Sequence, residues 1–231
     1  MQTLYRAWPL GQLPAEWQRP EIAQLREEGY SVEDPRDAVA LFERKVAEYA
    51  GARYGVAVDS CTNALFLSLK YTNRPQTVTI PARTYCSVPN AILQAGYTVR
   101  LEDVDWRGSY RLAPLDVHDG ATRFTRGMYR GGLHCLSFQL KKRLPIGRGG
   151  MILTDDPEAA RWLRIAAHDG RHLEVPYEHD RFVPGWHMYM TPEDAARGVL
   201  LLDRLPAGND DTGGAENYTD LRERMPWLPA H

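Results

Sequence analysis

The stretch Ser137-Phe-Gln-Leu-Lys-Lys142-Arg-Leu-Pro-Ile-Gly147-Arg-Gly-Gly150 combines a hydroxyl, a lysine five residues later, and a turn rich in glycine. This layout suits pyridoxal 5′-phosphate (PLP), because the lysine amine can form a Schiff base with the cofactor aldehyde and the hydroxyl can hold the phosphate. The glycines would let the backbone pass close to a flat ring. The alternative interpretation is a solvated surface, since Lys141, Lys142 and Arg143 form a basic cluster of the kind that usually faces water.

Predicted strands and helices alternate along the whole chain. Short apolar runs are each followed by a turn residue and then by apolar residues at helical spacing. This order favours an α/β fold with a mainly parallel sheet flanked by helices. The predicted strands are 54–58, 77–80, 98–104, 115–118, 135–138 and 151–154, and the predicted helices are 20–28, 37–50, 63–70, 88–94, 157–168 and 191–205.

The sequence predicts three parts of unequal size. Residues 1–33 are expected to form an irregular arm with one short helix, and residues 34–205 a large domain that binds the cofactor. From Pro206 the sequence turns polar and rich in glycine (Ala-Gly-Asn-Asp-Asp-Thr-Gly-Gly), which indicates a linker or a mobile loop. Residues 206–231 are therefore expected to be a short C-terminal remnant.

Composition excludes several classes of protein. The chain has 231 residues, of which 43% are hydrophobic and 25% charged, as in ordinary globular domains. Its net charge of -2 provides no basic footprint for nucleic acid and no polybasic surface for a membrane. The N-terminus does not resemble a signal peptide, and the apolar runs are too short to span a bilayer. The three cysteines lack metal-ligand spacing, so we expect reduced thiols, no metal site and a cytoplasmic protein.

Other parts of a PLP site can be assigned to side chains near predicted turns. A PLP enzyme that transfers amino groups needs a carboxylate at the pyridine nitrogen, an aromatic ring over the cofactor and a phosphate cup. Asp119 follows a predicted strand, at the sheet edge where open α/β folds bind ligands. Tyr85 offers the ring. Cys61 and Thr62 begin a predicted helix whose N–H groups can receive an anion, together with Ser137. Taken singly, these residues also fit ordinary roles as a turn residue, a core aromatic and a helix cap.

The order of these motifs resembles that of the DegT/StrS-type aminotransferases, fold-type I PLP enzymes that make amino sugars on nucleotide-sugar substrates. The resemblance spans about residues 20–205, and Ser-Phe-x-x-x-Lys…Gly-Arg-Gly-Gly is its most specific part. The other matching segments are Phe42-Glu43…Ala47-Glu-Tyr49-Ala-Gly51, 54–65, Pro81-Ala-Arg-Thr84-Tyr85, 90–96, 101–105, His118-Asp119-Gly-Ala121 and Ala195-Ala196-Arg-Gly198…Leu205.

The resemblance implies a role for each candidate residue. Lys142 would be the Schiff-base lysine and general acid/base, and Asp119 would hold the pyridinium. His187 stands where the family has an asparagine that completes the phosphate cup of the other subunit, within Gly185-Trp-His-Met-Tyr189 in place of Gly-x-Asn-x-Arg. The implied cofactor-binding residues are Ser60, Cys61, Thr62, Tyr85, Asp119, Thr122, Ser137, Lys142 and His187.

The chain departs from the family in residue types and in length. Ser60-Cys61-Thr62 replaces the usual Ser-Gly-Thr, and Thr122 stands where Gln or His is usual. Only residues 106–118 lie where the family carries an additional strand and helix, and a short segment follows Leu205 in place of a small domain. The expected fold is therefore a fold-type I PLP-dependent transferase large domain whose C-terminal small domain is largely missing.

The function implied by the resemblance is transamination. The chain would move an amino group from Glu or Gln to a keto acceptor, which by resemblance is a nucleotide-linked keto-sugar, within a homodimer that has composite active sites. Two alternatives remain open: a PLP enzyme of another reaction type, and a degenerate protein of this fold that binds cofactor or a partner without turnover. Lys142 argues against the dehydratase branch of the family, in which histidine replaces this lysine.

Overall fold

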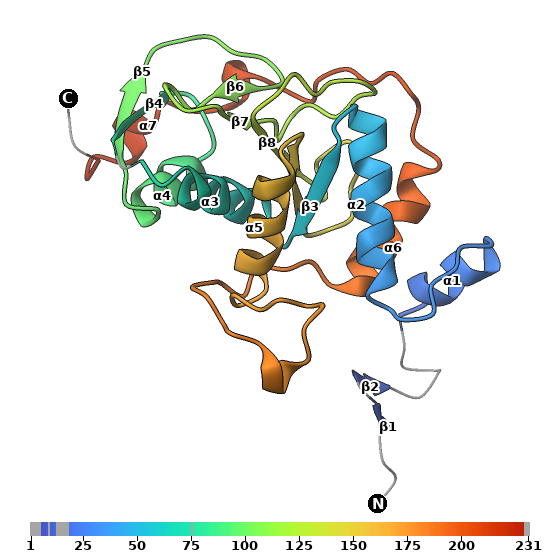
Figure 1. Cartoon of the computed structure of the whole chain (residues 1–231). Helices are drawn as coiled ribbons and strands as arrows, with labels where there is room; N and C mark the ends of the chain where they lie inside the picture. Colours follow the sequence, from blue (N-terminus) through green and yellow to red (C-terminus); the bar gives the residue numbers. More distant parts are fainter. Residues whose placement is uncertain (1–5, 9, 13–18, 75, 229–231) are drawn as a thin grey trace, which may run out of the picture.

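The computed structural model of the chain describes residues 6–8, 10–12, 19–74 and 76–228. Figure 1 shows a central sheet with helices on both faces, which confirms the predicted α/β fold. The strands are β1 (Arg6–Trp8), β2 (Leu10–Gln12), β3 (Tyr54–Val58), β4 (Thr77–Pro81), β5 (Thr98–Glu102), β6 (Tyr110–Arg111), β7 (Val117–Asp119), β8 (Leu133–Ser137) and β9 (Gly150–Thr154). The α-helices are α1 (Glu21–Glu27), α2 (Asp37–Ala50), α3 (Cys61–Thr72), α4 (Ser87–Gln94), α5 (Pro157–Ala167), α6 (Pro192–Leu202) and α7 (Leu221–Arg224).

The central sheet contains parallel and antiparallel neighbours: β3, β7 and β8 run in one direction, and β9 and β6 run in the other. Its strand order is β3-β9-β8-β7-β6, and only β7 and β8 pair in parallel. Strand β9 runs antiparallel to both neighbours because the chain returns beside β8 without a helical crossover, which parallel neighbours need. Strands β4 and β5 form a separate parallel pair, and β1 and β2 form an antiparallel hairpin that the sequence did not predict.

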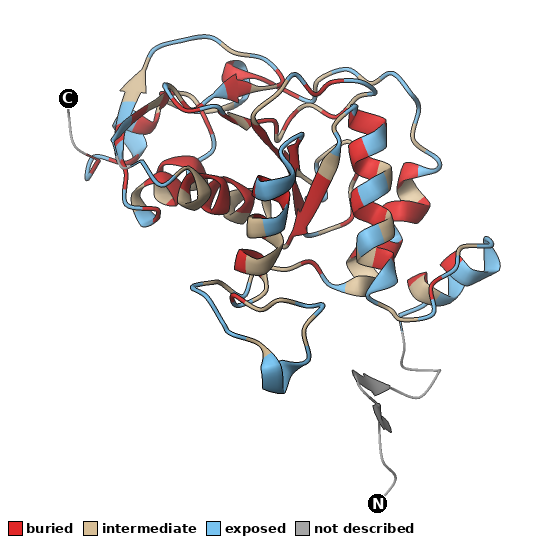
Figure 2. Cartoon of the chain, in the orientation of Figure 1, coloured by how far each residue is buried: buried red, intermediate tan, exposed pale blue. Residues whose placement is uncertain are grey.

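Side chains that alternate along the central strands fill two hydrophobic cores, one on each face of the sheet. Val56 of β3 and Ile152 of β9 belong to the core that α3 and α5 cover. Ala57 and Met151, one residue away on the same strands, belong to the core covered by α2 and α6. Figure 2 shows the buried residues of these helices turned toward the sheet.

The helix boundaries follow the capping residues in the sequence. Helix α2 ends at Gly51, whose φ of 84° lies in the left-handed region that favours glycine. Helix α6 begins after Thr191, whose hydroxyl accepts a hydrogen bond from the Asp194 N–H at 3.3 Å. Helix α3 begins after Ser60, whose hydroxyl accepts from the Asn63 N–H at 3.2 Å. The first two boundaries confirm the predicted ones.

The short segment before Asp119 forms a hairpin that joins the two sheets. Strands β6 and β7 pair in an antiparallel manner, with Tyr110 opposite Asp119. In the turn between them, Ala113 and Thr79 of β4 exchange two backbone hydrogen bonds of 2.8 and 3.1 Å. The hairpin therefore connects β4 to the central sheet and places Tyr110 beside Asp119.

Residues 207–218, here called the strap, cross the upper edge of the domain toward α7 (Figure 1). The Thr212 N–H donates to the Thr122 carbonyl at 2.8 Å, and the Gly108 N–H donates to the Gly213 carbonyl at 3.0 Å. These bonds contradict the prediction of a linker or mobile loop. The composition correctly indicated irregular backbone, but the backbone polar groups have partners on the domain.

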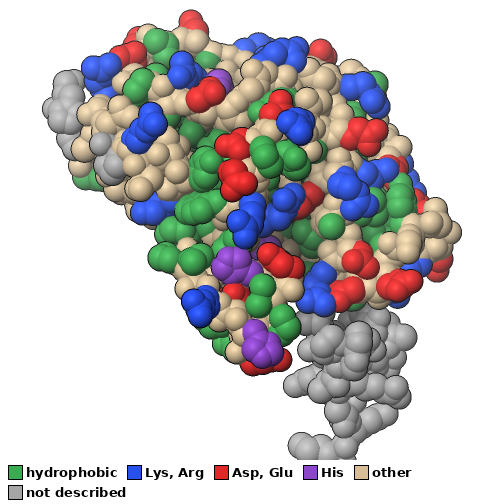
Figure 3. All heavy atoms as spheres, in the orientation of Figure 1, with side chains coloured by type: hydrophobic (Ala, Val, Ile, Leu, Met, Phe, Trp, Pro, Cys, Tyr) green, Lys and Arg blue, Asp and Glu red, His purple; other side chains and the backbone are tan. Residues whose placement is uncertain are grey.

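Beyond the strap, α7 packs against the side of the domain that contains α4 and β5. The Leu221 N–H donates to the Ala82 carbonyl at 2.9 Å. Leu221, Met225 and Leu228 are buried together against Leu93 and Leu101. On the face shown in Figure 3, side chains of Lys and Arg are interspersed with those of Asp and Glu. Every helix in the described ranges is too short or too polar to cross a membrane.

Candidate active site

A cavity of about 680 Å³ lies where β7 and β8 end and α3 begins. This is the edge of the sheet at which the sequence places the ligand. Among the predicted site residues, His187 does not line the cavity. The residues that do line it are Ser60, Cys61, Thr62, Tyr85, Asp119, Thr122, Ser137 and Lys142.

Asp119 forms the floor of the cavity and is only 5% exposed. Its Oδ1 accepts a hydrogen bond from the Ala121 N–H and its Oδ2 accepts one from the Tyr110 hydroxyl, both at 2.9 Å. Burial raises the pKa of the carboxyl, while these two donors and the Lys142 ammonium act in the opposite direction. A cation bound against Asp119 would further favour the charged carboxylate.

Tyr110 connects Asp119 to a second buried hydroxyl. The Tyr110 and Thr84 hydroxyl oxygens lie 2.6 Å apart. Because Tyr110 has one hydroxyl proton and donates it to Asp119, Thr84 must donate to Tyr110. The pKa of Tyr110 is raised well above its ordinary value, first by burial and then by the Asp119 charge, so its proton stays in place at neutral pH.

The Cys61 side chain also reaches the floor. Its Sγ lies 3.9 Å from Oδ1 of Asp119, within the range of a weak hydrogen bond from sulfur. Burial raises the pKa of the thiol well above its ordinary value, and the Asp119 charge adds to this effect. At neutral pH Cys61 is therefore a thiol that donates to Asp119.

The two adjacent lysines differ in exposure. Lys142 is half-buried and Lys141 is exposed, although both line the cavity. The positive charge of Lys142 acts to lower the pKa of both Asp119 and Cys61, which line the same cavity. Gln139 stabilises the turn that carries both lysines through two hydrogen bonds of 2.8 Å. Its carbonyl accepts from the Lys142 N–H, and its side-chain oxygen accepts from the Lys141 N–H.

The glycines that follow Lys142 allow close packing of the backbone. Gly149 has a φ of 143°, in the region that favours glycine, and it lines the cavity together with Gly147. A Cβ on Gly150 would lie 2.5 Å from the Ser60 carbonyl carbon. Gly150 therefore lets β9 begin directly against the backbone of Ser60 and Cys61.

Hydroxyls and backbone N–H groups gather at the start of α3. The Thr62 hydroxyl lies 2.8 Å from that of Ser87, and Ser137 lines the same cavity. The N-terminus of α3 adds unpaired N–H groups and a partial positive charge. Together with an amine and a buried carboxylate in one cavity, these groups fit the phosphate, aldehyde and ring nitrogen of PLP.

The rim carries the remaining predicted residues and several that the sequence did not predict. Tyr85 is 58% exposed. The Thr122 hydroxyl lies 3.0 Å from the carbonyl oxygens of both Gly108 and Gly213, so it holds the strap at the cavity. The cavity residues missed by sequence reasoning include Thr84, Ser87, Trp106, Arg148, Asn217 and Tyr218. Ser87 could have been found from its position at the start of a predicted helix.

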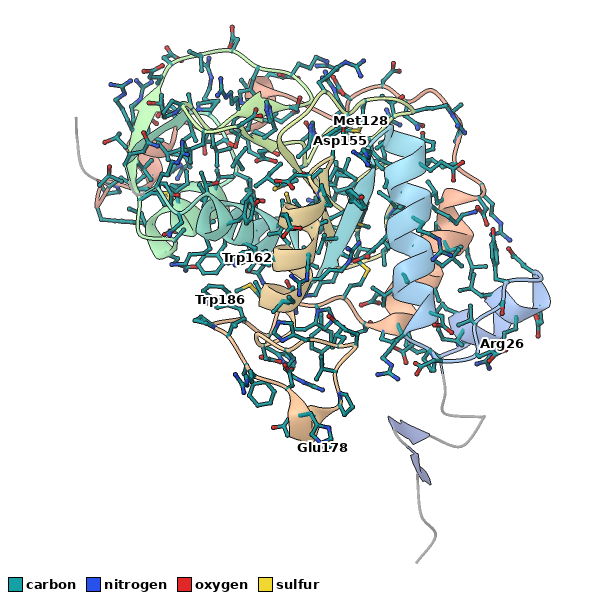
Figure 4. All side chains as sticks on the ribbon, in the orientation of Figure 1. Arg26, Met128, Asp155, Trp162, Glu178 and Trp186 are labelled. Carbon is teal, nitrogen blue, oxygen red and sulfur yellow. The ribbon has the colours of Figure 1, made fainter. Side chains whose placement is uncertain are left out.

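His187 lies outside the cavity, on the connection between α5 and α6. Figure 4 shows Glu178 at the far end of this connection and Trp186 where it rejoins the domain. The His187 side chain is 71% exposed and its Nδ1 lies 2.9 Å from a carboxylate oxygen of Asp169. It also packs edge-on against Tyr189, with ring centroids 4.7 Å apart. This position is open to another molecule.

Comparison with known proteins identifies the family of the chain. The sequence profile described as the DegT/DnrJ/EryC1/StrS aminotransferase family matches residues 21–130 and 127–212. The spore coat polysaccharide biosynthesis protein SpsC of Bacillus subtilis (strain 168) is 26% identical over 240 aligned positions, which cover 80% of this chain and 61% of SpsC. GDP-perosamine synthase of Caulobacter vibrioides is 24% identical over 213 positions, covering 72% of this chain and 57% of that enzyme.

Solved structures share the fold. Sugar aminotransferase CalS13 from Micromonospora echinospora superposes with a TM-score of 0.66 at 20% identity, covering 80% of this chain and 64% of CalS13. NtdA from Bacillus subtilis, solved with bound cofactor PMP, gives a TM-score of 0.64 at 18% identity over 80% of this chain and 52% of NtdA. The chain thus spans about three fifths of the length of the curated relatives it matches. These likenesses confirm the fold-type I architecture.

Proposed function

The chain belongs to the DegT/DnrJ/EryC1/StrS aminotransferase family, and on that premise we propose that it is a PLP-dependent aminotransferase. The observation that carries this proposal is that the half-buried Lys142 and the buried carboxyl of Asp119 line one cavity. We propose a nucleotide-linked keto-sugar as acceptor and Glu or Gln as donor. The names of SpsC and GDP-perosamine synthase support the sugar, and the donor rests on the family resemblance.

The cavity residues would have different roles in such a reaction. When bound, PLP supplies an aldehyde and a pyridinium ring that withdraws electrons from the substrate carbon. Lys142 would hold the cofactor covalently and, once released, remove and return a proton at the substrate carbon. Asp119 would keep the ring nitrogen protonated through a charge-assisted hydrogen bond. Thr62, Ser137 and the N-terminus of α3 would bind the phosphate.

Chemical trapping tests the proposal directly. Borohydride reduction of the PLP-loaded protein, followed by peptide mapping, should find the cofactor on Lys142. A label on Lys141 alone would show that the assignment is wrong. Addition of Glu or Gln to the loaded protein should change its visible absorbance. A protein that holds PLP on Lys142 but responds to no amine donor would instead be a binding protein without turnover.

We also propose a homodimer in which each subunit completes the other's phosphate cup. The connection that carries His187 exposes Leu173, Tyr177 and Phe182, three large apolar side chains. Such a surface is favourable to bury against a partner. Light scattering should give a mass near twice the 26.2 kDa of the chain. A monomer that holds PLP tightly would contradict the shared site, and unchanged PLP affinity in His187→Ala would remove His187 from it.

A cytoplasmic location is the last element of the proposal. Cys61, Cys86 and Cys135 are all free thiols, which suits a reducing compartment.

A further inference from the structure

The strap brings an aromatic ring to the cavity and fixes it there. Tyr218 stacks on Trp106, with ring centroids 5.8 Å apart and an angle of 26° between the planes. The Trp106 indole N–H donates to the Arg83 carbonyl at 2.8 Å, which fixes the ring beneath Tyr218. The Ala215 N–H donates to the Trp106 carbonyl at 3.0 Å. The two rings therefore form one platform, half from the strap and half from the hairpin segment.

The Tyr218 side chain lines the cavity together with Trp106, Asp119, Tyr85 and Cys61. Burial raises the pKa of its phenol, and the Asp119 charge adds to this effect. Tyr218 is therefore a partly buried phenol in the same cavity as the carboxyl of Asp119.

Asn217 adds a polar group next to this platform. Its side-chain Oδ1 accepts a hydrogen bond from the Gly214 N–H at 2.9 Å. An asparagine amide has two N–H donors on its nitrogen in addition to this acceptor. Because the oxygen is committed to the strap, the nitrogen is the group that Asn217 can offer to a ligand in the cavity.

We propose that Tyr218 and Asn217 form the acceptor-facing wall of the site and determine which sugar ring it accepts. A pyranose ring has an apolar face that suits an aromatic platform and polar substituents that suit an amide donor. An amino acid donor carries a carboxylate, which is better recognised by a cation such as Arg148, which also lines the cavity. This inference rests on the proposed aminotransferase function and adds which residues select the acceptor.

The experiment separates the two halves of the reaction. PLP-loaded protein is first treated with Glu or Gln, and the change in absorbance gives the donor step. It is then treated with UDP-, GDP- and dTDP-linked 4-keto-6-deoxyhexoses, and the return of the original spectrum gives the acceptor step. Calorimetric titration of the loaded protein with UDP-, GDP- and dTDP-hexoses measures sugar binding independently of turnover.

Four variants test the wall. Tyr218→Ala should lower kcat/KM of the acceptor step and weaken sugar binding about tenfold, while the donor step stays within about twofold. Tyr218→Phe keeps the ring and should retain most of the activity. Asn217→Asp keeps the acceptor for Gly214 but removes the amide donor, and should cost about threefold in the acceptor step. Trp227→Ala is the matched control, because Trp227 is 59% exposed on the same C-terminal segment.

The outcomes distinguish a failure of the proposed function from a failure of this inference. A wild-type protein that fails the donor step overturns the proposed function and this inference with it. A wild-type protein that completes both steps, while Tyr218→Ala leaves both unchanged or reduces both equally, overturns the inference alone. A wild-type protein that completes the donor step but reacts with none of the sugars overturns the assignment of the wall to a sugar ring. Unfolding midpoints close to that of the wild type exclude misfolding of the variants.

Discussion

The floor of the cavity and the strap above it are held by different kinds of interaction. On the floor, Asp119 and Tyr110 are buried side chains at paired strand ends, linked by a hydrogen bond of 2.9 Å. The strap is held mainly by backbone hydrogen bonds and by ion pairs such as Arg107–Glu216, whose side chains are 63% and 57% exposed. A buried network fixes geometry, whereas an exposed backbone contact tolerates changes in side chains. The floor of the cavity therefore suits residues that take part in the proposed reaction. The strap suits residues that would select the substrate.

Lys142→Ala is the change on the floor that should have the largest effect. Loss of the amine removes both the covalent hold on the cofactor and the proton carrier, so we expect turnover to fall at least about a thousandfold. Lys141→Ala, one residue away and exposed, should change turnover by no more than a few fold. Comparable losses in the two variants would mean that the amine was assigned to the wrong residue.

Asp119→Asn tests the carboxylate with little change of shape. The charge-assisted bond to the ring nitrogen is lost, so turnover should fall about a hundredfold, which corresponds to about 3 kcal/mol. Cofactor should remain bound, because the phosphate contacts are intact. The measurement is single-turnover kinetics with the absorbance of bound PLP as control, and undiminished turnover would exclude the proposed role.

Tyr110→Phe should have a smaller effect that depends on pH. The Tyr110 hydroxyl lowers the pKa of Asp119, so its removal should raise that pKa further. Because Asp119 must be ionised to hold the pyridinium in the proposed reaction, the acid limb of the pH–rate profile should move to higher pH. Turnover at neutral pH should fall about tenfold at most. A uniform loss at all pH values would indicate a packing defect instead.

Arg123→Ala tests the strap and should have the smallest effect. Arg123 forms two parallel hydrogen bonds to Asp211, of 2.8 and 2.9 Å, at the point where the strap meets the domain. Its loss should cost about 1 kcal/mol in the free energy of unfolding and speed proteolysis within residues 207–218. Arg107→Ala, which breaks the more exposed pair with Glu216, should cost less.

The pH dependence of that strap contact has a definite sign. The Arg123 hydrogen bond holds the pKa of Asp211 below its ordinary value. A lowered carboxyl pKa stabilises the folded state above the unfolded pKa, and this contribution is lost as pH falls through the lower value of the folded state. Urea unfolding of wild type and Arg123→Ala should therefore differ at pH 7, and the difference should shrink only as pH falls from about 4 through the lower folded-state pKa of Asp211.

The same contrast explains which parts the sequence could predict. Lys142, Asp119 and Cys61 lie in contiguous motifs at the ends of predicted strands and at the start of a predicted helix, so their shared edge followed from the order of elements. The position of Tyr110 beside Asp119 could not be predicted, because a strand of two residues is too short to show a sequence pattern. Tyr218 was missed because its segment has the composition of a linker, and its contacts come from residues far away in the chain. The antiparallel direction of β9 was not predicted because strand direction depends on connections, not on local pattern.

The position of β9 has a consequence for the order of folding. Tyr54 of β3 pairs with Thr154 of β9, and Ser60 pairs with Gly149 at the other end of this pair of strands. Strands β3 and β9 are far apart in the sequence, yet they must pair before the central sheet is complete. This pairing raises the contact order of the protein, so we expect it to be slow. Until β9 has been synthesised, the edges of β3 and β8 are open to pairing with other chains. The same insertion that pairs these edges also brings Gly149 and Gly150 against Ser60 and Cys61, so the start of α3 is completed only when β9 joins the sheet.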